Sequence, residues 1–97
     1  MPCRSLLIVR LLPGTRAEAV AAYHQRRVLE ECAEAIPQYI AGQVCLSDND
    51  PDLICIEVDW SDPQGWHDWM VHPVRAAQAG DIGRFVAGIV HSGVYTW

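Results

Sequence analysis

The chain has 97 residues and a formal net charge of −5, and all seven of its basic residues are arginines. This length accommodates a single domain, residues 1–97, with one modest core. The arginines are scattered and form no basic stripe, which argues against a nucleic-acid partner. No apolar run is long enough to cross a bilayer and the first residues lack a secretory-signal pattern, so we expect a cytoplasmic protein without a membrane partner.

Residue types that bind metals are present but are not spaced as metal sites. The cysteines have no Cys-x-x-Cys pair, and no two histidines form His-x-x-x-His on one helix face. Cysteines in a reducing compartment usually act as small core residues, which we expect for Cys3, Cys32, Cys45 and Cys55. We therefore expect no metal site.

The first half of the chain predicts a strand followed by a long helix. Residues 4–12 are rich in Leu, Ile and Val and end at a Pro-Gly pair, which is typical of a buried strand and a turn. Thr15 is a candidate N-cap with Glu18 as its capping-box partner. Helical periodicity then continues over residues 16–36 and stops before Pro37.

The middle of the chain predicts a hairpin formed by residues 39–47 and 53–60, joined by an Asp/Asn/Pro turn at 48–51. Alternation places one set of large apolar residues on a single face of the second strand: Ile54, Ile56, Val58 and Trp60. The opposite face carries Glu57 and Asp59, for which Arg4 and Arg10 on the first strand are candidate partners.

The last third predicts a broken helix and a final strand. Asp62 and a following proline form a strong helix start. Pro73 must bend or break this helix because it lacks an N–H group. Residues 81–86 form a short helical piece, and residues 90–97 a strand with one face lined by His91, Gly93, Tyr95 and Trp97.

The predicted order is therefore β-α-β-β-α-β, a ferredoxin-like α+β fold whose antiparallel sheet has both helices on one face. The other face would expose Trp or Ile side chains in a lone subunit. Packing of sheet against sheet in a homodimer, a dimeric α+β barrel, would cover them.

Several segments carry a resemblance to known families. Residues 3–13 resemble the first strand of the tetracenomycin-type polyketide cyclases, and His72-Pro73-Val74 followed by Ile82-Gly83-Arg84-Phe85 resembles their His-Pro segment and the helix after it. Residues 68–75 resemble the matching stretch of the stress-responsive barrel proteins that include olivetolic acid cyclase, and Trp60-Ser61-Asp62 resembles the Trp-x-Asp of the antibiotic biosynthesis monooxygenases. All three groups are dimeric α+β barrels.

The resemblance implies a cofactor-free polyketide cyclase or aromatase of secondary metabolism, acting by acid–base aldol-type cyclisation of a poly-β-ketone or aromatic polyketide. The tyrosine and histidine that form the acid–base pair of the olivetolic acid cyclase group are replaced here by Trp69 and Arg75. The alternatives are a cofactor-free monooxygenase that oxidises a phenolic or anthrone-like substrate to a quinone, and a non-catalytic dimeric module that binds a small ligand.

The candidate catalytic residues are three histidines and one arginine. His72 leads as the base, because a neutral imidazole accepts a proton near neutral pH; the alternative is that its ring bonds backbone freed by Pro73. Arg75 would hold a carbonyl or phenolate oxygen, or is a solvated surface arginine. His91 would form a pocket wall or part of the dimer seam, and His24 would point to the pocket or to solvent.

The candidate substrate-binding residues are aromatic, since indole and phenol rings offer flat apolar area together with a hydrogen-bonding group. They are Trp60, Trp66, Trp69, Tyr23 and Tyr95. The alternative is that the tryptophans fill the core and the dimer interface.

Overall fold

The computed structural model describes residues 2–97. Its strands are β1 (Cys3–Leu11), β2 (Tyr39–Leu46), β3 (Leu53–Trp60) and β4 (Val86–Thr96), and its α-helices are α1 (Arg16–Gln25), α2 (Val28–Ala35), α3 (Pro63–Met70) and α4 (Pro73–Ile82). The 3₁₀ turn η1 (Gly83–Phe85) joins α4 to β4. Within residues 2–97, no helix is long and apolar enough to cross a membrane.

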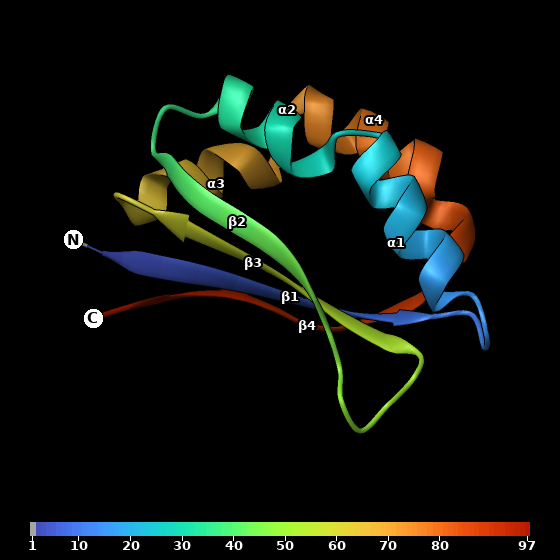
Figure 1. The fold of residues 1–97 in the computed structure, drawn as a ribbon. Coiled ribbons are helices and arrows are strands. Elements are labelled where there is room, and N and C mark those ends of the chain that lie inside the picture. Colours follow the sequence, from blue (N-terminus) through green and yellow to red (C-terminus); the bar gives the residue numbers. More distant parts are fainter. Residues whose placement is uncertain (1) are drawn as a thin grey trace.

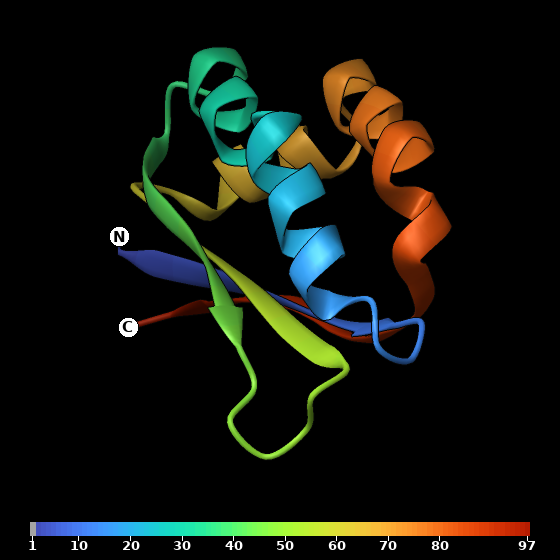
Figure 2. The ribbon, with the colours of Figure 1, turned by 45° about the vertical axis from the view of Figure 1, so that its right-hand side comes forward.

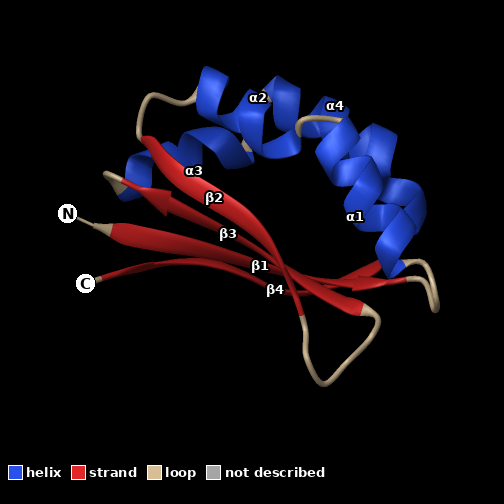
Figure 3. Ribbon diagram, viewed as in Figure 1, coloured by secondary structure: helices blue, strands red, loops and turns tan. Residues whose placement is uncertain are grey.

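The strands form one sheet in the order β2-β3-β1-β4, and each neighbouring pair is antiparallel. All four helices cover the same face of this sheet, and the two ends of the chain lie at one end of it (Figures 1 and 3). The predicted ferredoxin-like α+β fold with helices on one face is confirmed.

Strand β3 shows why the sheet has one buried face. Its residues alternate between buried and half-buried, and the buried ones are the four large apolar residues expected: Ile54, Ile56, Val58 and Trp60. The Trp60 indole donates a hydrogen bond from Nε1 to Ser5 Oγ at 2.9 Å, which satisfies its polar group inside the core.

The first helical segment is two helices rather than the single helix predicted over 16–36. Arg27 adopts a left-handed conformation, with φ 58° and ψ 43°, and so ends α1 and begins α2. Its N–H donates to the carbonyl of His24 and its own carbonyl accepts from Glu31 N. The apolar periodicity continued across this position, so the pattern carried no signal of the break.

The capping box predicted for this helix is also absent. Thr15 is the N-cap residue, but its hydroxyl donates to the carbonyl of Leu12 and does not cap the helix. The hydroxyl therefore closes the preceding turn, and no bond to Glu18 forms.

The second helical segment is broken at Pro73, as predicted. Asp62 caps α3 by accepting a hydrogen bond from Gln64 N at 2.8 Å, and Pro73 occupies the first turn of α4. Helix α4 runs on to Ile82, so the short helical piece predicted over 81–86 is the end of α4 followed by η1. Strand β4 begins at Val86, four residues before the predicted start.

The core consists of two apolar clusters under different helices. One gathers residues mainly from β1, β3, α1 and α4: Val9, Leu11, Ala19, Tyr23, Ile54, Ile56 and Ile82. The other lies toward α2 and α3: Cys3, Cys32, Ile36, Val58, Trp60 and Trp69. Figure 2 shows α1 and α2 beside α4 above the sheet.

The helix-free face is more polar than predicted, because the isoleucines of β3 face the helices. Arg4 pairs with Asp59 at 2.7 Å and lies 4.0 Å from Glu57, which confirms one of the predicted partners. Arg10 pairs instead with Asp50 at 3.2 Å. These exposed pairs contribute little stability each, but they keep the face hydrated.

The four cysteines are free thiols. Cys3 and Cys32 are buried core residues as expected, and burial raises the pKa of Cys32 to about 12. Cys45 and Cys55 are half-buried and face each other across β2 and β3. Cys45 Sγ donates to a Glu57 carboxylate oxygen at 3.0 Å, which raises the pKa of the Cys45 thiol to about 11.

The left-handed residue at the α1–α2 junction yields a stability prediction. Arg27→Gly and Arg27→Ala both remove the exposed Arg27–Glu34 ion pair, but only glycine adopts positive φ without a Cβ penalty. We expect the glycine variant to have a free energy of unfolding about 1 kcal/mol higher than the alanine variant, measured by urea denaturation. Equal stabilities would show that the junction is not strained.

Candidate functional site

A hollow of about 370 Å³ lies between the sheet and the helices. We call it the larger hollow. Its lining is predominantly apolar and comes from all four helices and from three strands: Leu7, Val9, Tyr23, Val28, Ile56, Trp69, Arg75, Gln78, Ala79, Ile82, Gly83, Val86 and Ile89. A mostly apolar hollow with a few polar groups is typical of a small-molecule site.

A second, smaller hollow of about 50 Å³ adjoins the first. Its lining is rich in indole rings: Ser5, Leu7, Ile56, Val58, Trp60, Trp66, Trp69, Met70, Arg75 and Ser92. Four residues line both hollows. Leu7 and Ile56 are paired on β1 and β3, and Trp69 and Arg75 come from the helices above.

The break at Pro73 places these two helical residues. Trp69 lies in the last turn of α3 and is 9% exposed. Because the chain turns before Pro73 and starts a new helix, Arg75 in the first turn of α4 also faces the sheet. An uninterrupted helix would place residues six apart on different sides.

Arg75 is the one charged residue of the larger hollow, and it is half-buried. It makes no hydrogen bond or ion pair with any of residues 2–97. The other six arginines each bond to a carboxylate or to backbone carbonyls: Arg4, Arg10, Arg16, Arg26, Arg27 and Arg84. A guanidinium without a counter-ion beside apolar walls favours the binding of an anion.

Tyr23 adds a hydrogen-bond donor to the same hollow. The side chain is 4% exposed, and its hydroxyl makes no hydrogen bond within the described chain. Burial raises the pKa of Tyr23, and the positive charge of Arg75 acts in the opposite direction. A phenol is protonated at neutral pH, so the Tyr23 hydroxyl can donate to a ligand oxygen.

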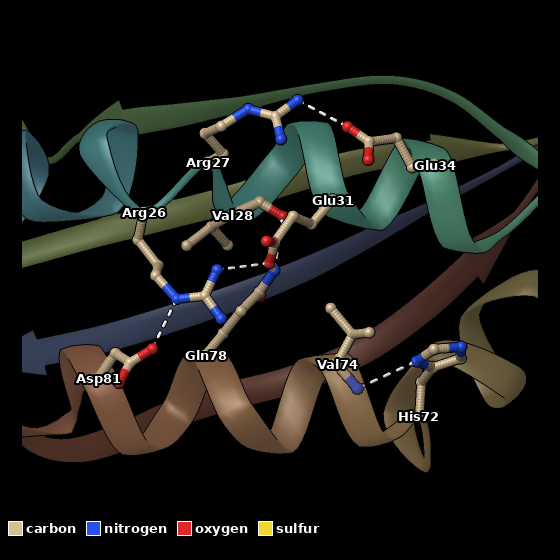
Figure 4. A network of polar contacts seen from close by, with 9 residues as sticks. All are labelled: Arg26, Arg27, Val28, Glu31, Glu34, His72, Val74, Gln78 and Asp81. Carbon is tan, nitrogen blue, oxygen red and sulfur yellow. Dashed lines mark hydrogen bonds and ion pairs between the residues drawn. The ribbon is translucent and has the colours of Figure 1, made fainter.

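Gln78 is the remaining polar side chain of the larger hollow and is 3% exposed. Its amide nitrogen donates to the carbonyl of Val28 and to Glu31 Oε1, both at 3.1 Å. Glu31 also accepts from Arg26, which pairs in turn with Asp81 of α4 (Figure 4). These bonds lower the pKa of Glu31. They also connect α2 to α4 and so hold together the helical side of the larger hollow.

His72 caps α4 and does not line either hollow. Its Nδ1 accepts a hydrogen bond from Val74 N at 3.1 Å, so the ring is unprotonated at that nitrogen (Figure 4). The ring also stacks on Trp69, with centroids 5.7 Å apart and planes at 29°. The His72 ring is therefore bonded to the backbone, which fits the second of the two alternatives better than a catalytic base. Its partner is an N–H group and not a carbonyl.

His91 and Tyr95 lie together on the helix-free face. Their rings stack at 5.8 Å, and the Tyr95 hydroxyl and His91 Nε2 are hydrogen-bonded. Their register opposite Ile8 and Arg4 places them on the face away from both hollows. His24 is exposed on α1 and lines neither hollow.

The structure thus brings five of the nine proposed site residues to the two hollows. Arg75 and Trp69 line both, Tyr23 lines the larger, and Trp60 and Trp66 line the smaller. Gln78 was missed, although it stands three residues after Arg75 on the same side of a helix, where a long polar residue among alanines is a usable signal.

Among residues 2–97, no three histidine, cysteine or acidic side chains gather in a way that could hold a metal ion.

Comparisons with known proteins identify the fold. No protein-family model matches the chain, and no curated protein matches it. Solved structures match it over nearly its whole length. A proposed antibiotic biosynthesis monooxygenase from Chloroflexus aurantiacus has a TM-score of 0.73 and 20% identity, covering 100% of this chain and 93% of that one.

Two further solved structures have the same fold. SnoaB, described as a cofactor-independent oxygenase from Streptomyces nogalater, has a TM-score of 0.77 at 11% identity, covering 99% of this chain and 92% of that one. A proposed antibiotic biosynthesis monooxygenase from Nitrosomonas europaea has a TM-score of 0.78 at 7% identity, covering 99% and 89%. At these identities the chain shares the fold of these proteins; the resemblances to the two cyclase groups receive no specific support from them.

The capping role of His72 can be separated from a catalytic one. His72→Ala removes the acceptor for Val74 N and should lower the free energy of unfolding by about 1 kcal/mol. His72→Asn supplies a new N-cap acceptor and should restore most of that loss, measured by thermal and urea denaturation. If both variants were equally destabilised, the loss of the N-cap acceptor would not be the cause of the lower stability.

Proposed function

We propose that the protein is a cytoplasmic enzyme that binds a phenolic or anthrone-like anion in the larger hollow and oxidises it with dioxygen, without a cofactor. The observation that carries this proposal is Arg75, a guanidinium in an apolar hollow without a counter-ion in the described chain. The fold shared with SnoaB, described as a cofactor-independent oxygenase, gives additional support.

The chemistry depends on stabilising a substrate oxyanion. The guanidinium of Arg75 lowers the pKa of an enol or phenol bound beside it, and the Tyr23 phenol donates a second hydrogen bond to the same oxygen. The apolar walls of the larger hollow lower the local dielectric constant and so strengthen both interactions.

The oxidation then uses the electrons of the substrate itself. The enol tautomer of an anthrone loses its hydroxyl proton to solvent before it binds, and the bound anion transfers an electron to dioxygen. The resulting carbon radical and superoxide combine to a peroxide, which takes up a proton and loses water to leave a carbonyl. Anthrone and O₂ thus give anthraquinone and H₂O, with the methylene carbon oxidised and dioxygen reduced.

Cyclisation of a poly-β-ketone is the alternative, and the lining residues argue against it. An aldol-type cyclisation needs a base to remove a proton from carbon. No histidine or carboxylate within residues 2–97 lines the larger hollow, and His72, His91 and His24, on which the cyclase prediction depended, lie elsewhere. A substrate that arrives already ionised at oxygen, as a phenolate or an enolate, needs no such base, so the oxygenase fits these residues better.

We further propose that the protein is a homodimer formed through the helix-free face of the sheet. A lone chain of this size buries a modest core, and this face carries half-buried Leu6 and Ile8. At its end, Tyr95 is 48% and Trp97 68% exposed. Aromatic residues of this kind are enriched in protein interfaces.

The central test of the function replaces the unpaired arginine. Arg75→Gln should lower oxygen uptake with anthrone about 100-fold, because a charged donor to the developing oxyanion is lost, whereas Arg75→Lys should retain part of the activity. Oxygen uptake and anthraquinone formation are followed together and should be equimolar.

Arg84→Gln is the matched control, since Arg84 is exposed and bonds to the carbonyl of Asp81 away from the hollow. Product formed from a polyketide without oxygen uptake would favour the cyclase. Binding of anthrone without turnover would favour the non-catalytic module.

The homodimer is tested by sedimentation. The wild-type protein should sediment at twice the chain mass of 10.8 kDa. Tyr95→Asp introduces a charge on the helix-free face and should weaken association at least tenfold, whereas His24→Asp, on an exposed helix position, should leave it unchanged. A wild-type monomer at micromolar concentration would rule out this assembly.

A further inference from the structure

The smaller hollow has the size and lining of a site for a small apolar molecule. Its volume of about 50 Å³ is far too small for an aromatic ring system but larger than the space that one water molecule needs. Three tryptophans, Trp60, Trp66 and Trp69, contribute to its walls, together with Met70.

The position of the smaller hollow relates it to the anion site. Trp69 and Arg75 line both hollows, above the paired Leu7 and Ile56 of the sheet. A molecule in the smaller hollow would therefore lie next to an anion in the larger one, with the guanidinium of Arg75 within reach of both.

We propose that the smaller hollow is the dioxygen site of the reaction, an inference that rests on the proposed function. Dioxygen is small and apolar, so it partitions from water into an apolar space of this size. Electron transfer from the substrate anion moves negative charge from the larger hollow into the smaller one. Arg75 borders both, so it stabilises the substrate anion before the transfer and the superoxide after it.

The walls are held in place by contacts outside the hollow. The Trp60 indole donates to Ser5 Oγ at 2.9 Å. The Trp69 ring stacks on His72, which is itself fixed by its bond to Val74 N. His72 is thus a positioning residue for the wall between the two hollows. It has no contact with the reacting atoms.

The first test is independent of activity. A crystal of the wild-type protein held under xenon gas should show a xenon atom between the indoles of Trp60, Trp66 and Trp69, because xenon occupies small apolar cavities. Xenon confined to the larger hollow, or absent from both, would overturn the dioxygen site.

The second test is kinetic and uses one exposed wall residue, which can be enlarged without disturbing the core. Ser92→Leu should fill the smaller hollow and raise the KM for dioxygen about fivefold or more, with the Kd for 2-naphthoate in the larger hollow unchanged. Ser92→Ala, which leaves the space open, is the matched control. An equal KM for dioxygen in the two variants would overturn the inference.

The two proposals fail in different ways. If the wild-type protein consumed no oxygen with any phenolic or anthrone substrate, the proposed function would fall, whereas xenon between the indoles would still establish a gas-binding hollow. Suppose that Arg75→Gln abolished oxygen uptake, but that no xenon bound in the smaller hollow and Ser92→Leu left the KM for dioxygen unchanged. The proposed function would then stand and the dioxygen site would fall. Circular dichroism melting curves of the variants establish that each is folded.

Discussion

The positive charge of Arg75 is the constraint on which the functional account depends. A guanidinium beside apolar walls is unfavourable unless an anion or polar groups neutralise it. Every other arginine of the chain has such a partner, and Arg75 has none within residues 2–97. A charge-assisted hydrogen bond to a ligand would contribute about 1.5–3 kcal/mol, so we expect the hollow to prefer anionic ligands.

Two breaks in the helical layer create the space around this charge. Arg27 ends α1 in a left-handed conformation, and Pro73 ends one helix and starts the next. Four short helices can therefore arch over the sheet with the core divided into two clusters. The bonds from Gln78 to α2 hold α2 and α4 together, so the hollow is part of the fold and needs no rearrangement to form.

The fold was predictable from the sequence because its signals are local. Alternation in β3, the Asp62 cap and Pro73 each act over a few residues, and the structure retains all three. The break at Arg27 was not predictable, since arginine rarely adopts positive φ and the apolar stripe continued through it. The site was predicted in part: Arg75 and Trp69 line the hollows. For His91 the sequence left a pocket wall and a dimer seam open, because strand parity does not tell which face the helices cover.

A crystal structure with 2-naphthoate bound would show directly whether Arg75 binds an anion in the larger hollow. A carboxylate oxygen should lie about 3 Å from the guanidinium of Arg75, within reach of the Tyr23 hydroxyl, with the rings between Ile56 and Ile82 in the larger hollow. A ligand bound on the helix-free face, or an Arg75 side chain turned to solvent beside an empty hollow, would contradict it.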